Sequence, residues 1–358
     1  MLRISSAASG EEVASVPMSE LLQEGLPSVG LLKRFLVQRH FEKKYSRFQL
    51  RFLREGDPSE LKEDEQITAV TELQLMILSH LPPDEERDAA FLDSCGYEVE
   101  RFEEVERSLQ ALQNPDLDPT WHVSPLSAAA EEGHTGVVRL LLEAGANTEW
   151  RTEAEGEDCQ RTALHSAADA GYLEVVRLLL DFGANKDAAN SSGRTALHLA
   201  AENGYASLVG LLLESGANKE ANAAGFRPLH LAAMQGHLQV VTLLLDSGAH
   251  KEAMGKGGYR PLHCAAKRGH TGVLRRLLDS RAEVDAEDVA NMRPLHLAAD
   301  KGLFVVVHAL LASGASKAAQ DSFGRTPGDL ASANGHQAVA RLLKNPKRRR
   351  VESSSETS

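Results

Sequence analysis

The stretch RPLHLAAMQGHLQVVTLLLDSGA, residues 227–249, is one complete unit of a pattern that the chain repeats. Its opening tetrad recurs at a spacing of 33 residues, with one slip to 32. The six tetrads begin at Thr162, Thr195, Arg227, Arg260, Arg293 and Thr326, and a degenerate copy begins at Ser124. Each tetrad is followed by a small-residue segment, an apolar segment and a turn centred on glycine. Such a period predicts a stack of similar helical units.

This period and the tetrad Thr-Pro-Leu-His resemble the known signature of ankyrin repeats. The resemblance implies a mostly α ankyrin-repeat solenoid of about seven repeats over residues 121–345. It also implies a non-catalytic, monomeric protein that binds other proteins in a concave groove. The partner's identity does not follow from the repeats.

The composition of each unit explains why the units must stack. The second helix of one unit contains Val175, Val176, Leu178, Leu179 and Leu180, which leave it scarcely any polar side. Neighbouring units therefore have to cover it on both flanks. Paired alanines keep the first helix thin, and glycines end the helices where the backbone needs a positive φ. In one unit Arg281 replaces such a glycine.

Residues 1–82 lie outside the repeat and predict a separate α+β domain. Strands are expected at 2–5, 12–16, 48–53 and 72–78, with a helix over 28–40. This order resembles a ubiquitin-like β-grasp fold. The chain departs from ubiquitin because Ser79-His-Leu-Pro-Pro follows the last strand in place of a Gly-Gly end. The module therefore cannot be conjugated to a substrate.

The ubiquitin resemblance implies a recognition face at Leu53, Gln74 and Met76. Ubiquitin-pathway receptors are then a second class of expected partner. Alternatively, Leu53 and Met76 pack against the acidic segment that follows. That segment, 83–120, holds twelve acidic residues against three arginines but keeps apolar residues at helical spacing. It predicts a degenerate ankyrin repeat that caps the stack, rather than a disordered acidic linker.

The recurring histidines suggest metal binding, but their spacing argues against it. Successive histidines are expected roughly 10 Å apart along stacked helices, whereas zinc needs nitrogens within about 2.1 Å of one ion. In the family this histidine bonds the backbone of the turns. The cysteines Cys95, Cys159 and Cys264 lie in separate units without a CxxC pair, which favours a reduced intracellular chain. We expect no catalytic residue, no metal and no cofactor.

Composition and termini set the expected location and exclude some partner classes. The net charge of -12 argues against general nucleic-acid binding, and no apolar run is long enough to cross a membrane. We therefore expect a cytoplasmic or nuclear protein. The tail 346–358 is expected to be disordered, and its Lys347, Arg348, Arg349 and Arg350 form either a nuclear-import signal or a solvated basic run. If these residues are a nuclear-import signal, an alternative function is favoured: the protein is then a nuclear regulator that masks a transcription factor or signalling protein.

The two residues between each Ala-Ala pair and its glycine are expected to line the groove. In order they are Glu131 and Glu132, Asp169 and Ala170, Glu202 and Asn203, Met234 and Gln235, Lys267 and Arg268, and Asp300 and Lys301. This order predicts an acidic first part and a basic later part, which would align a partner of opposite polarity. The alternative is a solvated face with unrelated charges.

The loops that precede the tetrads, here called fingers, are expected to supply apolar contacts through Phe226, Tyr259 and Met292. One finger is enlarged, because 38 residues separate Ser127 from His165. Its Trp150 is either a binding anchor or a cover for the repeat beneath.

The arginines at three tetrads are expected to weaken their helices. Arg227, Arg260 and Arg293 stand where Thr195 supplies a hydroxyl that can cap the first helix. Threonine at position 260 is therefore expected to stabilise the array.

Overall fold

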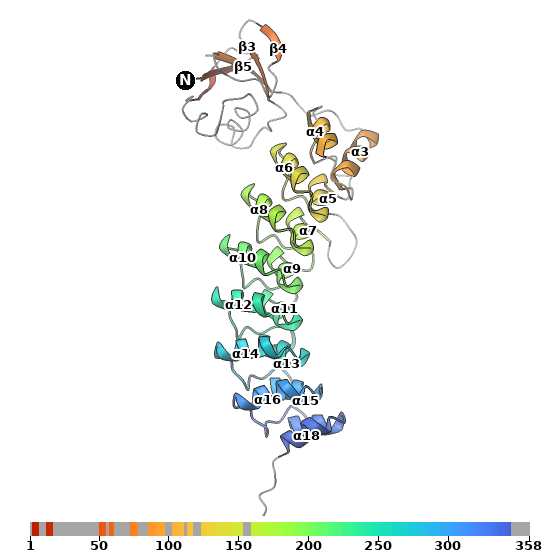
Figure 1. Ribbon diagram of the computed structural model, residues 1–358, viewed down its shortest axis with the longest axis vertical. Coiled ribbons are helices and arrows are strands. Elements are labelled where there is room, and N and C mark those ends of the chain that lie inside the picture. The colour runs from red at the N-terminus through yellow and green to blue at the C-terminus, as the bar shows by residue number, and fades with distance from the viewer. Residues whose placement is uncertain are drawn as a thin grey trace, which may run out of the picture. The chain divides into compact units, whose positions relative to one another are not determined.

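The structure, a computed structural model, describes residues 2–6, 12–16, 50–54, 57–60, 72–77, 85–96, 102–110, 113–116, 123–152 and 159–344. The chain divides into two compact units, Met1–Ser191 and Ser192–Ser358. The first unit contains a sheet and the first helices, and the second contains only helical repeats among its described residues (Figure 1).

The sheet of the first unit has five strands in the order β2-β1-β5-β3-β4. Strand β1 pairs antiparallel with β2 and parallel with β5, and β3 pairs antiparallel with β4 and β5. The strands are β1 (Leu2–Ser6), β2 (Glu12–Val16), β3 (Leu50–Arg54), β4 (Asp57–Glu60) and β5 (Glu72–Ile77). Strands therefore occur at all four expected places, and β4 is an addition. The helix expected over 28–40 lies outside the described residues.

Helices of the first unit form two layers. The first layer packs α3 on α5 and α5 on α7, and the second packs α4 on α6 and α6 on α8. The helices are α3 (Glu85–Gly96), α4 (Phe102–Gln110), α5 (Pro125–Glu132), α6 (Thr135–Glu143), α7 (Ala163–Ala170) and α8 (Leu173–Asp181). The acidic segment thus contributes a helix pair, α3 and α4, to the stack.

The second unit repeats the same helix pair five times within residues 196–343. First helices contact first helices, and second helices contact second helices, which gives the two columns of Figure 1. The helices are α9 (Ala196–Asn203), α10 (Ala206–Glu214), α11 (Pro228–Gln235), α12 (Leu238–Asp246), α13 (Pro261–Arg268), α14 (Thr271–Asp279), α15 (Pro294–Asp300), α16 (Phe304–Ala312), α17 (Pro327–Ala333) and α18 (Gln337–Leu343), with a short 3-10 turn, η2 (Lys256–Gly258), in one finger.

Local sequence sets the helix boundaries. Proline occupies the first turn of α11, α13, α15 and α17, where its missing N–H would have no helical partner. Helix α11 ends at Gln235 and is capped by Gly236, whose φ is 84°. A Cβ there would lie 2.4 Å from Nδ1 of His270 in the next repeat, so the position admits only glycine. Arg281 stands at the turn where the other units have glycine. Its φ of 62° is the positive value that this turn requires.

The core lies between consecutive repeats rather than inside one. Helices of seven to nine residues are too short to be stable alone in water. In the helix pair α11 and α12, the side chains of Ala232, Ala233, Val240, Val241 and Leu244 are each 0% exposed. Burial of these side chains against both neighbouring repeats supplies the stability that a single unit lacks.

Among the described residues, no helix combines the length and apolar character that crossing a membrane requires.

Candidate protein-interaction face

The histidines of the tetrads connect each repeat to the following finger. His198, His230, His263 and His296 are 0% exposed. Each directs Nε2 toward the backbone of the next repeat. The acceptors are, in order, the carbonyl oxygens of Phe226 (3.2 Å), Tyr259 (3.0 Å), Met292 (3.1 Å) and Arg325 (3.2 Å). The acceptors are finger residues, so the sequence-based expectation of backbone bonding is confirmed.

The other ring nitrogen fixes the tautomer of these histidines. In one repeat the backbone N–H of Arg260 donates to Nδ1 of His263 at 3.2 Å. A backbone amide can only donate, so Nδ1 is unprotonated and Nε2 carries the proton that reaches the finger carbonyl. Burial is the first cause that lowers the pKa of His230, His263 and His296 below its ordinary value. The rings are therefore neutral at pH 7.

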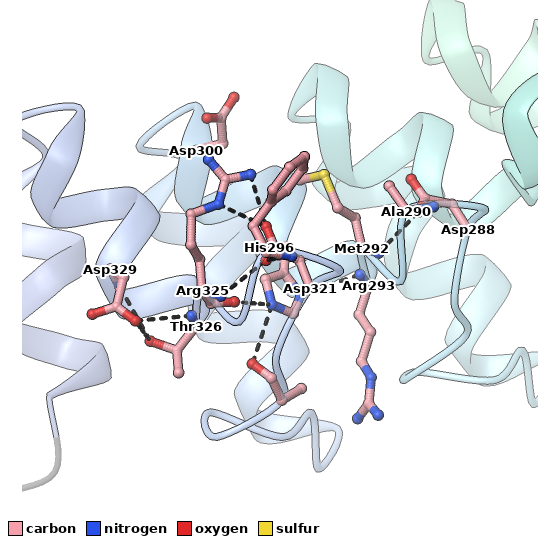
Figure 2. A network of polar contacts seen from close by, with 12 residues as sticks. Asp288, Ala290, Met292, Arg293, His296, Asp300, Asp321, Arg325, Thr326 and Asp329 are labelled. Atoms are coloured by element: carbon pink, nitrogen blue, oxygen red, sulfur yellow. Dashed lines mark hydrogen bonds and ion pairs between the residues drawn. The ribbon is translucent and has the colours of Figure 1, made fainter.

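Two consecutive fingers are closed by an aspartate at their base (Figure 2). The carboxylate of Asp288 accepts the backbone N–H groups of Ala290 and Met292, both at 2.8 Å. Asp321 likewise accepts the N–H of Arg325 at 2.9 Å, and it also forms an ion pair with the Arg325 guanidinium at 2.7 Å. These bonds hold the residue before each tetrad in a fixed position, where the histidine reaches its carbonyl.

The arginines at the tetrads form ion pairs that the expectation about helix capping did not include. Arg260 pairs with Glu252 at 2.7 Å and also with Glu283 of the following finger. The helix N-terminus does not lack a partner, because His263 accepts the N–H of Arg260. At Thr195 the hydroxyl lies 2.9 Å from Nδ1 of the tetrad histidine His198. A threonine at 260 would therefore remove two ion pairs.

The predicted groove residues of the second unit occupy the ends of the first helices. Together with the fingers they make up the inner face, defined as Glu202, Asn203, Met234, Gln235, Lys267, Arg268, Asp300, Lys301, Phe226, Tyr259 and Met292. The second residue of each helix-end pair is exposed, and so is Lys267. Glu202, Met234, Asp300 and the three finger residues are half-buried.

Ion pairs within the repeats alter the charge expected of this face. Glu202 pairs with the finger residue Arg194 at 2.9 Å, and Asp300 pairs with Lys301 at 3.3 Å. Both acids are therefore neutralised internally. The acidic-to-basic gradient predicted from the sequence does not describe the second unit, where the uncompensated charge is concentrated at Lys267 and Arg268.

Finger residues contact the first helix at a fixed separation of eight positions, a feature that reading the tetrads alone did not reveal. Arg161 pairs with Asp169 in the first unit at 2.9 Å, and Arg194 pairs with Glu202 in the second unit. In a later repeat the same separation brings Tyr259 to Lys267, with Nζ 3.3 Å from the hydroxyl and 5.0 Å from the ring centroid. The 33-residue period places Phe226 and Met234 in the equivalent relation.

The enlarged finger of the first unit is closed by backbone bonds. The N–H of Thr152 donates to the carbonyl of Arg161, and the N–H of Gln160 donates to the carbonyl of Thr152, both at 2.9 Å. Trp150 beside this base is half-buried, so the tryptophan partly covers the repeat and partly remains accessible. Residues 153–158 lie outside the described residues.

Two predicted sites are described only partly or not at all. Leu53 and Gln74 are register partners across β3 and β5, and Met76 pairs with Arg51 two positions along the same strands. The backbone thus places the three residues of the predicted ubiquitin-like face close together. The cluster Lys347, Arg348, Arg349 and Arg350 lies outside the described residues.

The cysteines and histidines form no reactive constellation in the described part of the chain. Burial raises the pKa of the Cys95 and Cys264 thiols to about 12, so neither is a thiolate at pH 7. The neighbour of Cys264, His263, has both ring nitrogens engaged by backbone groups. No group of three or more His, Cys, Asp or Glu side chains suited to a metal ion occurs among residues that the structure describes.

Comparison with known protein families agrees with this geometry. The family model for ankyrin repeats matches five overlapping segments, residues 101–190, 128–223, 182–255, 218–288 and 262–353. These segments cover more than half of the chain, so the protein belongs to the ankyrin-repeat family. A search of curated proteins finds no significant match. Ankyrin repeats are general protein-interaction modules, so membership indicates a protein partner and does not identify it.

Proposed function

We propose that this protein is a non-catalytic adaptor that binds a protein partner on the inner face of its second unit. The observation that carries the proposal is that this face exposes side chains at regular intervals. Asn203, Gln235, Arg268 and Lys301 are exposed at intervals of one repeat, and the fingers beside them are held by buried histidines. A surface that is fixed before binding loses little conformational freedom when a partner docks.

Quantitative affinity purification with matched variants tests the adaptor proposal. The Lys267→Glu/Arg268→Glu variant changes the inner face, whereas Arg275→Glu/Arg341→Glu makes the same charge change at exposed positions of the second helices. At least one protein captured by the unaltered full-length chain should be lost with the first variant and retained with the second. Equal capture by all three chains would remove the inner face as the binding site.

For the N-terminal region we propose a ubiquitin-like module that adds contacts with ubiquitin-pathway receptors. The support is the strand order β2-β1-β5-β3-β4, in which the neighbouring strands β1 and β5 are parallel. This arrangement is typical of the β-grasp fold. The proposal is tested by binding of the full-length protein to an immobilised ubiquitin-binding domain. Replacing Leu53 and Met76 with Ser should weaken binding at least about tenfold, the scale expected when central apolar contacts are lost. No binding by the unaltered chain would reject the receptor contact.

The acidic helix pair α3 and α4 is proposed as the N-terminal cap of the repeats. It carries the same turn as the later units, because the N–H of Asp116 bonds the side chain of Asn114 at 3.1 Å and the N–H of Glu149 bonds that of Asn147 at 2.9 Å. The Asp116 carboxylate also accepts the N–H of Asn147 at 2.7 Å. Deleting residues 83–116 should therefore lower the melting temperature of the repeats, as loss of a polar cap exposes an apolar layer.

The basic tail is proposed to direct nuclear import, the observation being its cluster of four cationic residues between 347 and 350. Replacing all four with alanine in a fusion too large to diffuse through nuclear pores should lower the nuclear fraction. An unchanged fraction would leave the tail as a solvated end.

A further inference from the structure

The inner face of the second unit has one concentrated charge. Lys267 and Arg268 end helix α13 and are both exposed. No ion pair of either residue occurs among the described residues of the chain. Lys267 instead lies against Tyr259, with its ammonium 5.0 Å from the ring centroid, an arrangement that leaves its charge available to an anion.

On both sides of this cationic pair the inner face is apolar or carries charges that pair with each other. In the preceding repeat the equivalent positions are Met234 and Gln235, with Phe226 on the finger. In the following repeat the finger residue is Met292, and Asp300 is paired with Lys301. From one repeat to the next, the inner face is therefore apolar, then cationic, and then apolar at the finger beside an internally paired helix end.

Building on the proposed adaptor function, we propose that the partner presents an extended acidic segment with an apolar side chain on either side of its acidic residue. The carboxylate pairs with Lys267 and Arg268, and the flanking side chains contact Met234 with Phe226 on one side and Met292 on the other. Stacked helices repeat at about 10 Å. An extended chain in the polyproline II conformation advances about 3.1 Å per residue with three residues per turn, so side chains three positions apart lie on one face. The apolar residues of the partner therefore stand about three positions before and after the acid.

An acidic partner is expected because the acidic residues of the inner face, Glu202 and Asp300, form ion pairs within the chain. If Glu202 and Asp300 were unpaired, the inner face would alternate in sign and would favour a segment of alternating charge. Because Arg194 and Lys301 neutralise them, a lysine-rich segment would meet only repulsion at Lys267 and Arg268. Neutralisation within the repeat thus selects an acidic partner.

The test is selection of random ten-residue peptides displayed on phage against the full-length chain. Selected peptides are then synthesised, and their dissociation constants are measured for the unaltered chain and three variants with unchanged melting temperatures. Lys267→Glu/Arg268→Glu reverses the charge, and Gln235→Trp covers the face without changing charge. Arg275→Glu/Arg341→Glu is the matched control on the second helices.

The expected peptides carry Asp or Glu with an apolar residue about three positions away. Their dissociation constant should rise at least about tenfold with the charge reversal and stay unchanged in the control. The effect should shrink in 0.5 M salt, because exposed charges are screened at that ionic strength.

Two other outcomes separate failure of this inference from failure of the adaptor proposal. Peptides without acidic residues that lose binding only with Gln235→Trp would overturn the acidic partner and keep the inner face as a binding site. Peptides that bind all variants equally, or no enrichment of any peptide, would overturn both.

Discussion

The interior repeats and the last repeat of the second unit use different residues at the same position. In the interior, His296 accepts the N–H of Arg293 through Nδ1 and reaches the carbonyl of Arg325 in the next finger through Nε2. In the last repeat, Asp329 accepts the N–H of Thr326 at 2.9 Å, and no finger follows within the described residues. Figure 2 shows the two arrangements side by side.

This difference separates two roles of one position. Capping the helix N-terminus requires only an acceptor three residues along, which a carboxylate supplies as well as an imidazole does. Connecting to the next repeat requires a donor on the far side of the side chain, which only histidine supplies here. The tetrad histidine is therefore a connection between repeats, and aspartate takes its place in the last repeat that the structure describes.

The largest effect should come from giving an interior repeat a residue that caps without connecting. In His263→Asn the amide oxygen can still accept the N–H of Arg260, but the carbonyl of Met292 loses its donor. Together with the space left by the smaller side chain, this should cost about 3 kcal/mol of unfolding free energy. Denaturant unfolding measures it. The matched change at the exposed last position, Asp329→Asn, should stay within about 0.5 kcal/mol, and equal costs at both positions would remove the distinction.

Acid should weaken the interior repeats through the same histidines. Their folded pKa is lowered, so the unfolded chain binds more protons as the pH falls through about 6.5. Stability contributed by the neutral rings is present above that value and is lost below it. Lowering the pH from 7.5 to 5.5 should therefore lower the denaturation midpoint. His263→Asn should make this pH dependence shallower, because one of the buried rings is gone.

The smallest effect should come from the arginine tetrads. Arg260→Thr removes pairs with Glu252 and Glu283 and should destabilise the array by about 0.5–1 kcal/mol, as expected for partly exposed pairs. Arg227 has one described carboxylate partner, Glu220 at 3.3 Å, so Arg227→Thr should cost less. Both costs should disappear in 0.5 M salt. A stabilised Arg260→Thr variant would restore capping as the dominant effect at this position.

Much of the fold could be predicted because the repeat itself carries the information. The period defines equivalent positions, so one tetrad locates every first helix and one glycine locates every helix end. Gly236 and Gly269, with φ of 84° and 88°, fit this expectation directly. Even the exception at Arg281 was visible as a break in the pattern.

The charge of the inner face could not be predicted in the same way. A period shows that Glu202 and Lys267 occupy equivalent places, but it does not show which side chain reaches each of them. The finger supplies Arg194 to the first and Tyr259 to the second, eight residues earlier in both cases. Counting charges along the helix ends therefore overestimated the acidity, and pairing across the loop had to be seen in three dimensions.

The most direct test of the inner face as the binding site is site-specific photocrosslinking in living cells. A photoreactive amino acid is placed in the full-length chain either at Gln235 on the inner face or at Arg275 on helix α14, both exposed positions. A discrete covalent adduct with another protein is expected from position 235 and none from position 275. An adduct from position 275 with none from position 235 would show that the partner does not bind on the inner face.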